Sequence, residues 1–153
     1  MEGKKVSESC VEMRQLVMPH QSNPQNTIFG GVVMSWIDMA GSMVASRHSG
    51  KHVVTAHIDG ITFKAPMFVG NHAHIKSSIH YVGRTSMEIG VEVKSEDPLT
   101  GIKRITTLAQ LTFVALDEFK KPCAIPPLIL ETEQQKKLYE EAKARHFLRK
   151  KKI

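Results

Sequence analysis

Residues 19–50 read PHQSNPQNTIFGGVVMSWIDMAGSMVASRHSG, and this stretch decides the fold. A polar loop with two prolines comes first, then the Gly30-Gly31 pair, and then apolar residues at helical spacing until Ser49-Gly50 ends the pattern. Because the apolar residues occupy more than one stripe, the spacing predicts a long helix that other elements wrap around. Asp38 lies inside this apolar run, and no lysine or arginine stands within four residues of it.

The sequence after the helix changes from helical to alternating periodicity, which predicts about four antiparallel strands. In residues 52–66 the alternation of Val54, Ala56 and Ile58 changes parity at Gly60, as a β-bulge would produce. Residues 86–94 alternate most regularly, and a short turn joins them to the strand before. With a further strand within 9–18, these segments predict one sheet packed on the helix, an α+β domain.

The C-terminal segment carries the whole net charge of +6. Residues 136–153 contain eight basic and two acidic side chains, so residues 1–135 are neutral. Capping spacing from Thr132 to Gln135 and good helix formers predict a last helix. We therefore expect a domain over residues 1–130 and a basic helix and tail over 131–153. A solubilising tail is favoured, with contact to ligand phosphates or a partner as the alternative.

Composition bounds the class of protein. A chain of 153 residues suits one domain, and neither a leader sequence nor an apolar run of about 18 residues is visible. We expect a cytoplasmic protein that does not insert in membranes. Cys10 and Cys123 form no C-x-x-C pair, so free thiols are expected. The histidines follow no metal-ligand pattern, and we expect no metal.

Four segments resemble a known family in order and spacing. They are MPHQSNPQNTIFGGVVMSWIDMAGSMVA, VVTAHIDGITFKAP, VGRTSMEIGVEV and LTFVALDEFKKPCAIP. Together they resemble the hotdog-fold acyl-CoA thioesterases of the cytosolic acyl-CoA hydrolase group, over about residues 10–128. The resemblance implies a five- or six-stranded antiparallel sheet wrapped around one long central helix. It also implies dimers with active sites at the interface, commonly assembled into hexamers as trimers of dimers.

The resemblance also implies roles for individual residues. Asn23 and Asp38 match the two catalytic residues, which in that architecture come from different protomers, and the Gly31 N–H matches the group that faces the thioester carbonyl. The coenzyme A contacts match a turn made of Gly83, Arg84, Thr85 and Ser86. Phe29 stands where many relatives have histidine, and Trp36 is bulkier than the usual residue. These departures bear on acyl chain length more than on chemistry.

The residue types suit thioester hydrolysis. A helix that opens with two glycines offers unpaired N–H groups and the positive end of its dipole to a developing oxyanion. Asp38 is the candidate general base or nucleophile, and the sequence does not separate the two. Asn23 would position the water or the carbonyl, since an amide cannot act as the base. The prediction is hydrolysis of fatty acyl-CoA to free fatty acid and coenzyme A, without another cofactor.

Several alternatives remain open at this point. Asp38 could simply face solvent or bond a backbone group, and Arg84 could be a solvated charge. The fold could also serve a noncatalytic acyl-CoA sensor, or a dehydratase that uses a histidine such as His20. Nucleic-acid binding through the tail is disfavoured because the rest of the chain is neutral. Asp59, just before the expected bulge, could lie near the site but is interpreted as a structural acid of a turn or strand. Five apolar residues are expected in the core, although an acyl tunnel would use the same residue types: Met34, Met39, Met43, Met67 and Phe68.

Overall fold

The helix α1, Gly30–Ser49, determines where the rest of the chain packs. Its inward side chains are apolar and almost fully buried, with Val33, Ile37 and Val44 at 0 to 1% exposure. The helix ends where the sequence predicts, at Gly50, whose φ of 67° is a left-handed conformation that glycine adopts without strain. The computed structural model describes residues 1–151, so the last two residues of the expected tail lie outside the described residues.

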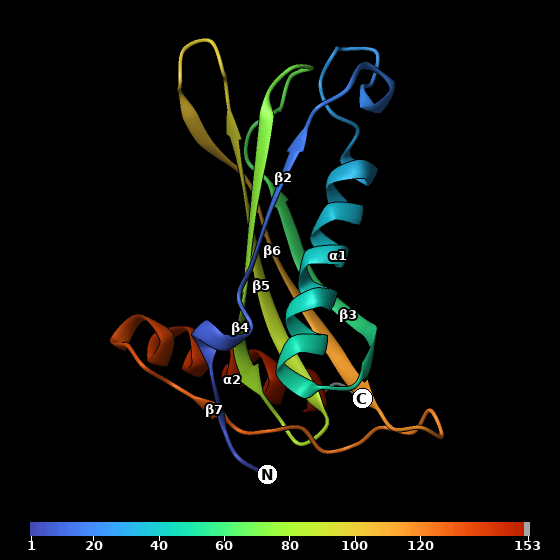
Figure 1. Ribbon diagram of the computed structural model, residues 1–153, viewed down its shortest axis with the longest axis vertical. Coiled ribbons are helices and arrows are strands. Elements are labelled where there is room, and N and C mark those ends of the chain that lie inside the picture. The colour runs from blue at the N-terminus through green and yellow to red at the C-terminus, as the bar shows by residue number, and fades with distance from the viewer. Residues whose placement is uncertain (152–153) are drawn as a thin grey trace.

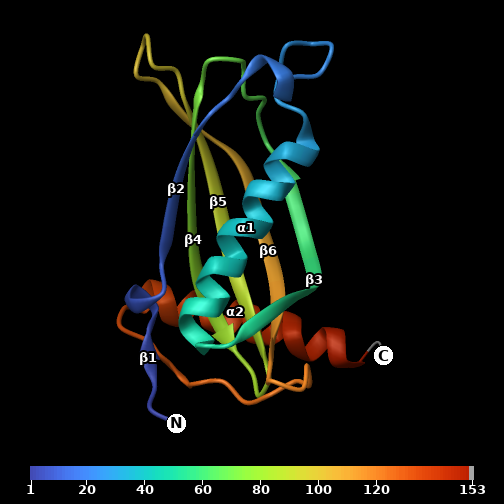
Figure 2. The ribbon, with the colours of Figure 1, turned by 45° about the vertical axis from the view of Figure 1, so that its right-hand side comes forward.

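A five-stranded antiparallel sheet curves around α1 in the order β2-β4-β5-β6-β3. The strands are β2 Val11–Leu16, β3 His52–Phe63, β4 His72–Val82, β5 Ser86–Glu96 and β6 Lys103–Leu116. Figures 1 and 2 show α1 lying across one face of this sheet, with β2 and β3 at its edges. The α+β architecture expected from the sequence, an antiparallel sheet around one central helix, is therefore confirmed.

The core lies between α1 and the inner face of the sheet. Ile89, Leu111 and Phe113 on the central strands have no exposed surface. A Cβ atom at Gly41 of α1 would lie 2.9 Å from the Phe113 ring, so glycine lets the helix approach the sheet closely at this point. Each such buried side chain contributes about 1.5 to 3 kcal/mol relative to exposure, and together they hold the helix in place.

The edge strand β3 contains two bulges, of which the sequence predicted one. Its pairing with β6 shifts at Ala56 and again at Asp59. The second shift is the parity change expected at Gly60. The first was missed because Val54 and Ile58 looked like members of one alternating face. Val54 pairs with Val114 and Ile58 pairs with Leu111, three positions away along β6. The extra residue in β3 therefore places the Val54 and Ile58 side chains on opposite faces of the sheet.

The C-terminal helix α2, Glu133–Lys151, packs on the outer face of the sheet, opposite α1. Its start is capped as expected, because the Gln135 N–H donates to the Thr132 hydroxyl at 3.1 Å. The Gln135 side chain instead accepts from the Glu131 N–H, one residue before the N-cap. Among the residues of α2, Ala142 is the buried one. Polar contacts therefore contribute much of its attachment.

Short segments complete the fold. The two-residue strands β1, Lys4–Lys5, and β7, Leu128–Ile129, pair in parallel, and the 3-10 turns η1, Val6–Glu8, and η2, Pro19–Gln21, flank β2. None of these was predicted, since two or three residues carry no periodic signal. Within residues 1–151, no helix combines the length and apolar character that a membrane crossing requires.

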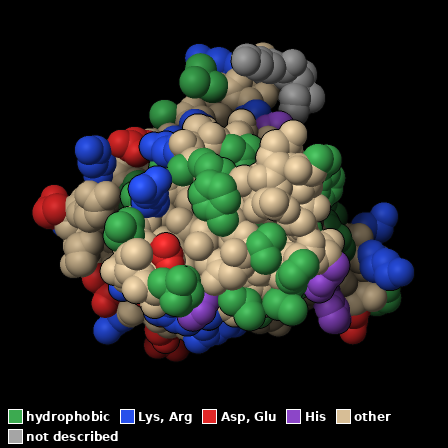
Figure 3. All heavy atoms as spheres, turned by 90° about the horizontal axis from the view of Figure 1, so that it is seen from above, with side chains coloured by type: hydrophobic (Ala, Val, Ile, Leu, Met, Phe, Trp, Pro, Cys, Tyr) green, Lys and Arg blue, Asp and Glu red, His purple; other side chains and the backbone are tan. Residues whose placement is uncertain are grey.

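Four of the five apolar residues expected in the core are exposed. Met34, Met39, Met43 and Phe68 have 40 to 50% exposure, and Met67 alone is buried. For the three methionines the expectation was wrong because α1 packs only one side on the sheet of its own chain, and Phe68 lies in the loop after β3. Exposed apolar side chains also occur on the loops at the end where α1 begins, which Figure 3 views from above.

Candidate active site

Asp38 lies half-buried on α1 and is held by β3. Its Oδ1 atom accepts a 2.7 Å hydrogen bond from the Thr55 hydroxyl. Within residues 1–151, no salt bridge involves this carboxylate. Thr55 was not predicted, because nothing in the sequence alone fixes which β3 residue faces Asp38. The structure therefore places the acid on the seam between the central helix and an edge strand.

The first turn of α1 is open to a ligand. Phe29 occupies the N-cap position, and its side chain offers no acceptor to the helix. The Gly31 N–H donates to no acceptor within the described part of the chain. A Cβ atom at Gly31 would lie 2.6 Å from the Phe29 ring, so a larger residue would require this exposed ring to move. A free donor at a helix N-terminus suits a carbonyl oxygen that becomes negatively charged.

Gly31 and Asp38 share one face of α1. They are separated by seven residues, or two turns, which corresponds to roughly 10 Å along the helix axis. The two groups of one chain therefore lie on the same side of the helix, two turns apart.

Asn23 organises the loop before α1. Its Oδ1 atom accepts from the Gln25 N–H at 3.0 Å and from the Thr27 N–H at 3.2 Å. Its Nδ2 atom donates to the Thr27 hydroxyl at 2.9 Å, which leaves the second amide hydrogen available to a ligand. Within residues 1–151, no hydrogen bond joins Asn23 to Asp38. One chain alone does not bring the two expected catalytic residues into contact.

The turn expected to contact coenzyme A is a hairpin between β4 and β5. The Gly83 N–H donates to the Ser86 carbonyl at 2.8 Å, and the Thr85 carbonyl accepts from Ala115 on β6 at 3.1 Å. Arg84 projects from the turn and is exposed. Figure 1 shows this hairpin at the opposite end of the molecule from the loop that carries Asn23. Within one chain, the two parts of the expected site are thus far apart.

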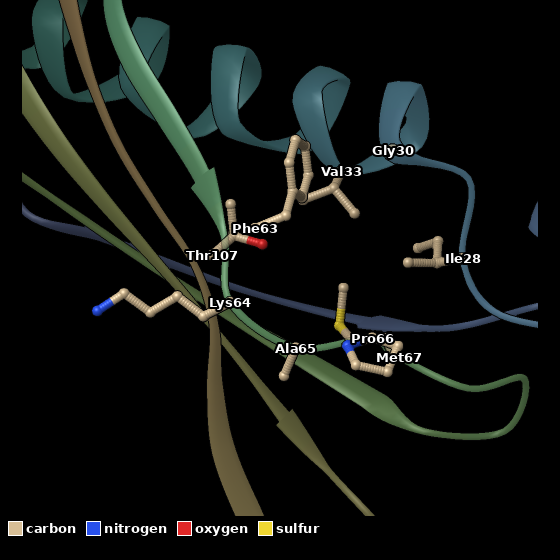
Figure 4. A pocket seen from close by; sticks show the side chains of 9 residues that line it. All are labelled: Ile28, Gly30, Val33, Phe63, Lys64, Ala65, Pro66, Met67 and Thr107. Carbon is tan, nitrogen blue, oxygen red and sulfur yellow. The ribbon is translucent and has the colours of Figure 1, made fainter.

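A cavity of about 370 Å³ lies beside the first turn of α1, on the same seam as Asp38 and Thr55. Its walls come from the start of α1, the end of β3 and the loop that follows, as Figure 4 shows. Most of the lining is apolar, with Val33, Phe63 and Met67 among the side chains, and Thr107 adds a hydroxyl. Lys64 also borders the cavity, but its amino group points away from the other lining side chains in Figure 4. The cavity can accept a small apolar group next to the free helix N-terminus.

A second group of polar residues is buried on the other side of the sheet, beneath α2. Glu88 has 1% exposure, and its Oε1 atom accepts from Arg145 Nε at 2.9 Å and Nη2 at 2.7 Å. Burial raises the pKa of the Glu88 carboxyl, and the bonded arginine opposes that shift. Burial, assisted by the Arg145 charge, lowers the pKa of His80 to about 4. This cluster lies away from α1 and contributes to attachment of α2.

Among residues 1–151, no group of three or more histidine, cysteine, aspartate or glutamate side chains converges as metal ligands would.

Comparison with known proteins decides the family. Residues 25–102, about half of the chain, match the thioesterase superfamily. The chain belongs to the thioesterase superfamily. A relative within this superfamily is the "uncharacterized acyl-CoA thioester hydrolase YkhA" of Bacillus subtilis, 38% identical over 88% of this chain and 78% of its own. The hotdog fold implied by the sequence resemblance is confirmed by the solved members that follow.

Two solved members of the thioesterase superfamily are very similar to the chain. An apo-hexameric acyl-CoA thioesterase has a TM-score of 0.95 and 40% identity, covering 99% of this chain and 97% of its own. An acyl-CoA hydrolase from Staphylococcus aureus, solved with butyryl coenzyme A, coenzyme A and coenzyme A disulfide, has a TM-score of 0.90 and 34% identity, covering 97% and 91%. Three variants of that enzyme, with alanine replacing an aspartate, an asparagine or a threonine, are each 32% identical to the chain.

Proposed function

We propose that this protein is an acyl-CoA thioester hydrolase that releases a free fatty acid and coenzyme A. The observation that carries the proposal is the seam between α1 and β3, where a free helix N-terminus, an apolar cavity and an acid held by Thr55 lie in line. Its similarity to named acyl-CoA hydrolases along nearly the whole chain supports the same reaction class.

Asp38 is the general base or the nucleophile in this proposal. As a general base it takes a proton from water, and the resulting hydroxide attacks the thioester carbonyl; as a nucleophile its carboxylate attacks directly and water then hydrolyses the anhydride. In both routes the carbon–sulfur bond breaks and coenzyme A leaves as a thiolate that takes up a proton. Thr55 orients the carboxylate, and Asn23 uses its free amide hydrogen to hold the water or the carbonyl.

The Gly31 N–H supplies the oxyanion donor. A preorganised donor of this kind contributes about 10²- to 10³-fold in rate. We assign the donor and the acid of each site to different copies of the chain. The same assignment accounts for the separation of Asn23 from Asp38 within one chain.

The Staphylococcus variants support these assignments independently. Their substituted asparagine, aspartate and threonine are separated along that chain by the same numbers of residues as Asn23, Asp38 and Thr55 are here. Spacing that agrees over three residues in a chain of the same fold favours equivalent positions.

A two-fold dimer along the β3 edge would assemble the site. The exposed Met34, Met39 and Met43 flank the seam and provide apolar surface for a second copy. A two-fold axis would bring the Asn23 loop of one chain beside the β4–β5 hairpin of the other chain. Gly83 to Ser86 of that hairpin would then bind the phosphates of coenzyme A. Further association of three dimers would give a hexamer, the state named for similar thioesterases.

The acyl group would enter the cavity beside Gly30. Its volume of about 370 Å³ accommodates a short or medium chain, and Phe63 and Met67 form apolar walls. No cofactor other than the coenzyme A of the substrate is proposed. The cytoplasmic location and the division of the chain at residue 130 stay predictions.

The test of function is thiol release from acyl-CoAs of increasing chain length. Wild-type protein should release coenzyme A well above the uncatalysed rate, and Asp38→Asn should lower kcat by about 10²- to 10⁴-fold while the melting temperature stays close to wild type. A wild-type protein that binds acyl-CoA in calorimetry and leaves it intact for hours would instead be a noncatalytic sensor. Near wild-type kcat in the Asp38 variant would remove that residue from the mechanism.

A further inference from the structure

The outer face of β3 is tied to the last turns of α2 by an ion pair. Arg149 Nη1 bonds Asp59 Oδ1, and the same oxygen lies 3.1 Å from His57 Nε2. The Asp59 side chain is 13% exposed, and its Oδ2 atom is buried without a hydrogen-bond partner among the described residues. A carboxylate in such surroundings is costly unless a cation accompanies it, so Arg149 makes its burial tolerable.

Asp59 lies at an irregular point of an edge strand. It is the extra residue of the second β3 bulge, and Ala56 is the extra residue of the first. A bulge leaves its extra residue out of the ladder, and β3 is an edge strand that has a neighbour, β6, on one side only. Contacts from other elements must therefore help to fix the course of this segment. Thr55, which holds Asp38, directly precedes the first bulge.

Two arginines on one face of α2 contact different strands. Arg145 binds Glu88 on β5, a central strand that has neighbours on both sides. Arg149, one turn later, reaches past the central strands to the β3 edge, towards which α2 runs in Figure 2. The first contact fastens the helix to a strand that is already fixed. The second connects the helix to the strand that carries an active-site residue.

We propose that Arg149 is a positioning residue for the active site, because its contact with Asp59 fixes the bulged part of β3 that presents Thr55 to Asp38. The inference rests on the proposed hydrolase function for its consequence in catalysis. The C-terminal helix thereby acts on the chemistry from the far side of the sheet without touching the substrate.

Steady-state kinetics of single and double variants test the coupling. Asp59→Asn and Arg149→Gln should each lower kcat about 10-fold with KM within about 2-fold, since a small displacement of a catalytic group costs rate more than binding. The double variant should be no slower than the slower single variant, because each substitution removes the same contact between Asp59 and Arg149. Arg149→Lys should recover most of the lost kcat.

Lys150→Gln is the matched control. It removes the same charge from the adjacent position, whose side chain is exposed, and should leave kcat and KM unchanged. If Arg149→Gln and Asp59→Asn lower the melting temperature but keep kcat within about 2-fold of wild type, the contact is only structural and the inference is overturned. A double variant whose losses multiply would overturn it as well.

Hydrogen exchange separates this inference from the proposed function. Peptides from residues 52–63 should exchange faster in Arg149→Gln than in wild type or Lys150→Gln, whether or not any acyl-CoA is hydrolysed. Inactive wild-type protein with this exchange pattern would mean that the proposed function fails while the positioning contact stands. Equal exchange in all three proteins would overturn the positioning contact itself.

Discussion

The Thr55 hydroxyl on β3 donates a 2.7 Å hydrogen bond to the Asp38 carboxylate on α1. This contact joins an edge strand to the central helix at the one acid of the apolar helical run. It restricts the rotation of a carboxylate that has no cationic partner among residues 1–151, and so gives the side chain a defined direction.

Removing the Thr55 hydroxyl should therefore slow the reaction without unfolding the protein. Thr55→Val keeps the shape of the side chain and should lower kcat about 10- to 100-fold, the rate equivalent of a hydrogen bond to a charged group. Thr55→Ser keeps the hydroxyl and should retain most of the activity. The kcat of both variants checks this prediction, and equal kcat values for Thr55→Val and wild type would contradict it.

Mixed oligomers should recover activity that neither parent has. Asn23→Ala and Asp38→Asn chains, inactive alone, should form mixed dimers in which one of the two sites is intact. Random pairing then gives about a quarter of wild-type activity, because a two-fold dimer has two equivalent sites. Differently tagged Asp38→Asn chains, refolded together, are the control. Absence of recovery in purified mixed dimers would show that each site is built from one chain.

The buried Glu88–Arg145 pair should be costly to break on one side. Arg145→Gln leaves a carboxylate with 1% exposure without its cation, and the free energy of unfolding should fall by about 3 kcal/mol. Glu88→Gln combined with Arg145→Gln removes both charges and should recover part of that loss. Urea unfolding at pH 7 measures all three proteins. A loss below about 1 kcal/mol in Arg145→Gln would mean that the pair is solvated in solution.

His80 should make the protein less stable in acid. Burial lowers its pKa from an ordinary value of 6.5 to about 4, so the unfolded chain takes up a proton before the folded chain does. Stability from this group is full above pH 6.5 and is lost as the pH falls towards 4, by about 3 kcal/mol. The raised pKa of Glu88 acts in the opposite direction, so a matched variant is needed to isolate the histidine.

His80→Phe supplies that comparison. It keeps an aromatic ring above Gly90, where a Cβ atom would lie 2.0 Å from the histidine ring, and it removes the titration. Urea unfolding at pH 7, 6, 5 and 4 should show a smaller loss of stability in the variant than in wild type. Parallel pH curves for the two proteins would contradict the prediction.

Periodicity made the main elements predictable. The apolar spacing of α1 and the alternation of β4, β5 and β6 reflect contacts made within one layer of the fold, so local sequence contains them. The position of Asp38 was recognisable because a lone acid interrupts an apolar pattern. The confirmed family resemblance strengthened that interpretation, although the role of each site residue stays a prediction.

Contacts between distant segments were not predictable. The bond between Thr55 and Asp38 depends on how a bulged strand lies against the helix, and a one-residue shift would turn Thr55 away. The pair formed by Asp59 and Arg149 joins residues 90 positions apart, and the local sequence around either residue does not indicate the other. The exposed Met34 was misjudged for a related reason: composition does not distinguish an apolar side chain in its own core from one on an external surface.

The two bulges of β3 also bear on aggregation of the chain before it assembles into dimers. An edge strand presents unpaired N–H and C=O groups on which any extended segment could add, and such addition starts aggregation. Ala56 and Asp59 interrupt that row within four residues. Such irregularities disfavour continuation of the ladder by a flat strand. The geometry that directs Thr55 should therefore also disfavour strand addition to newly made chains.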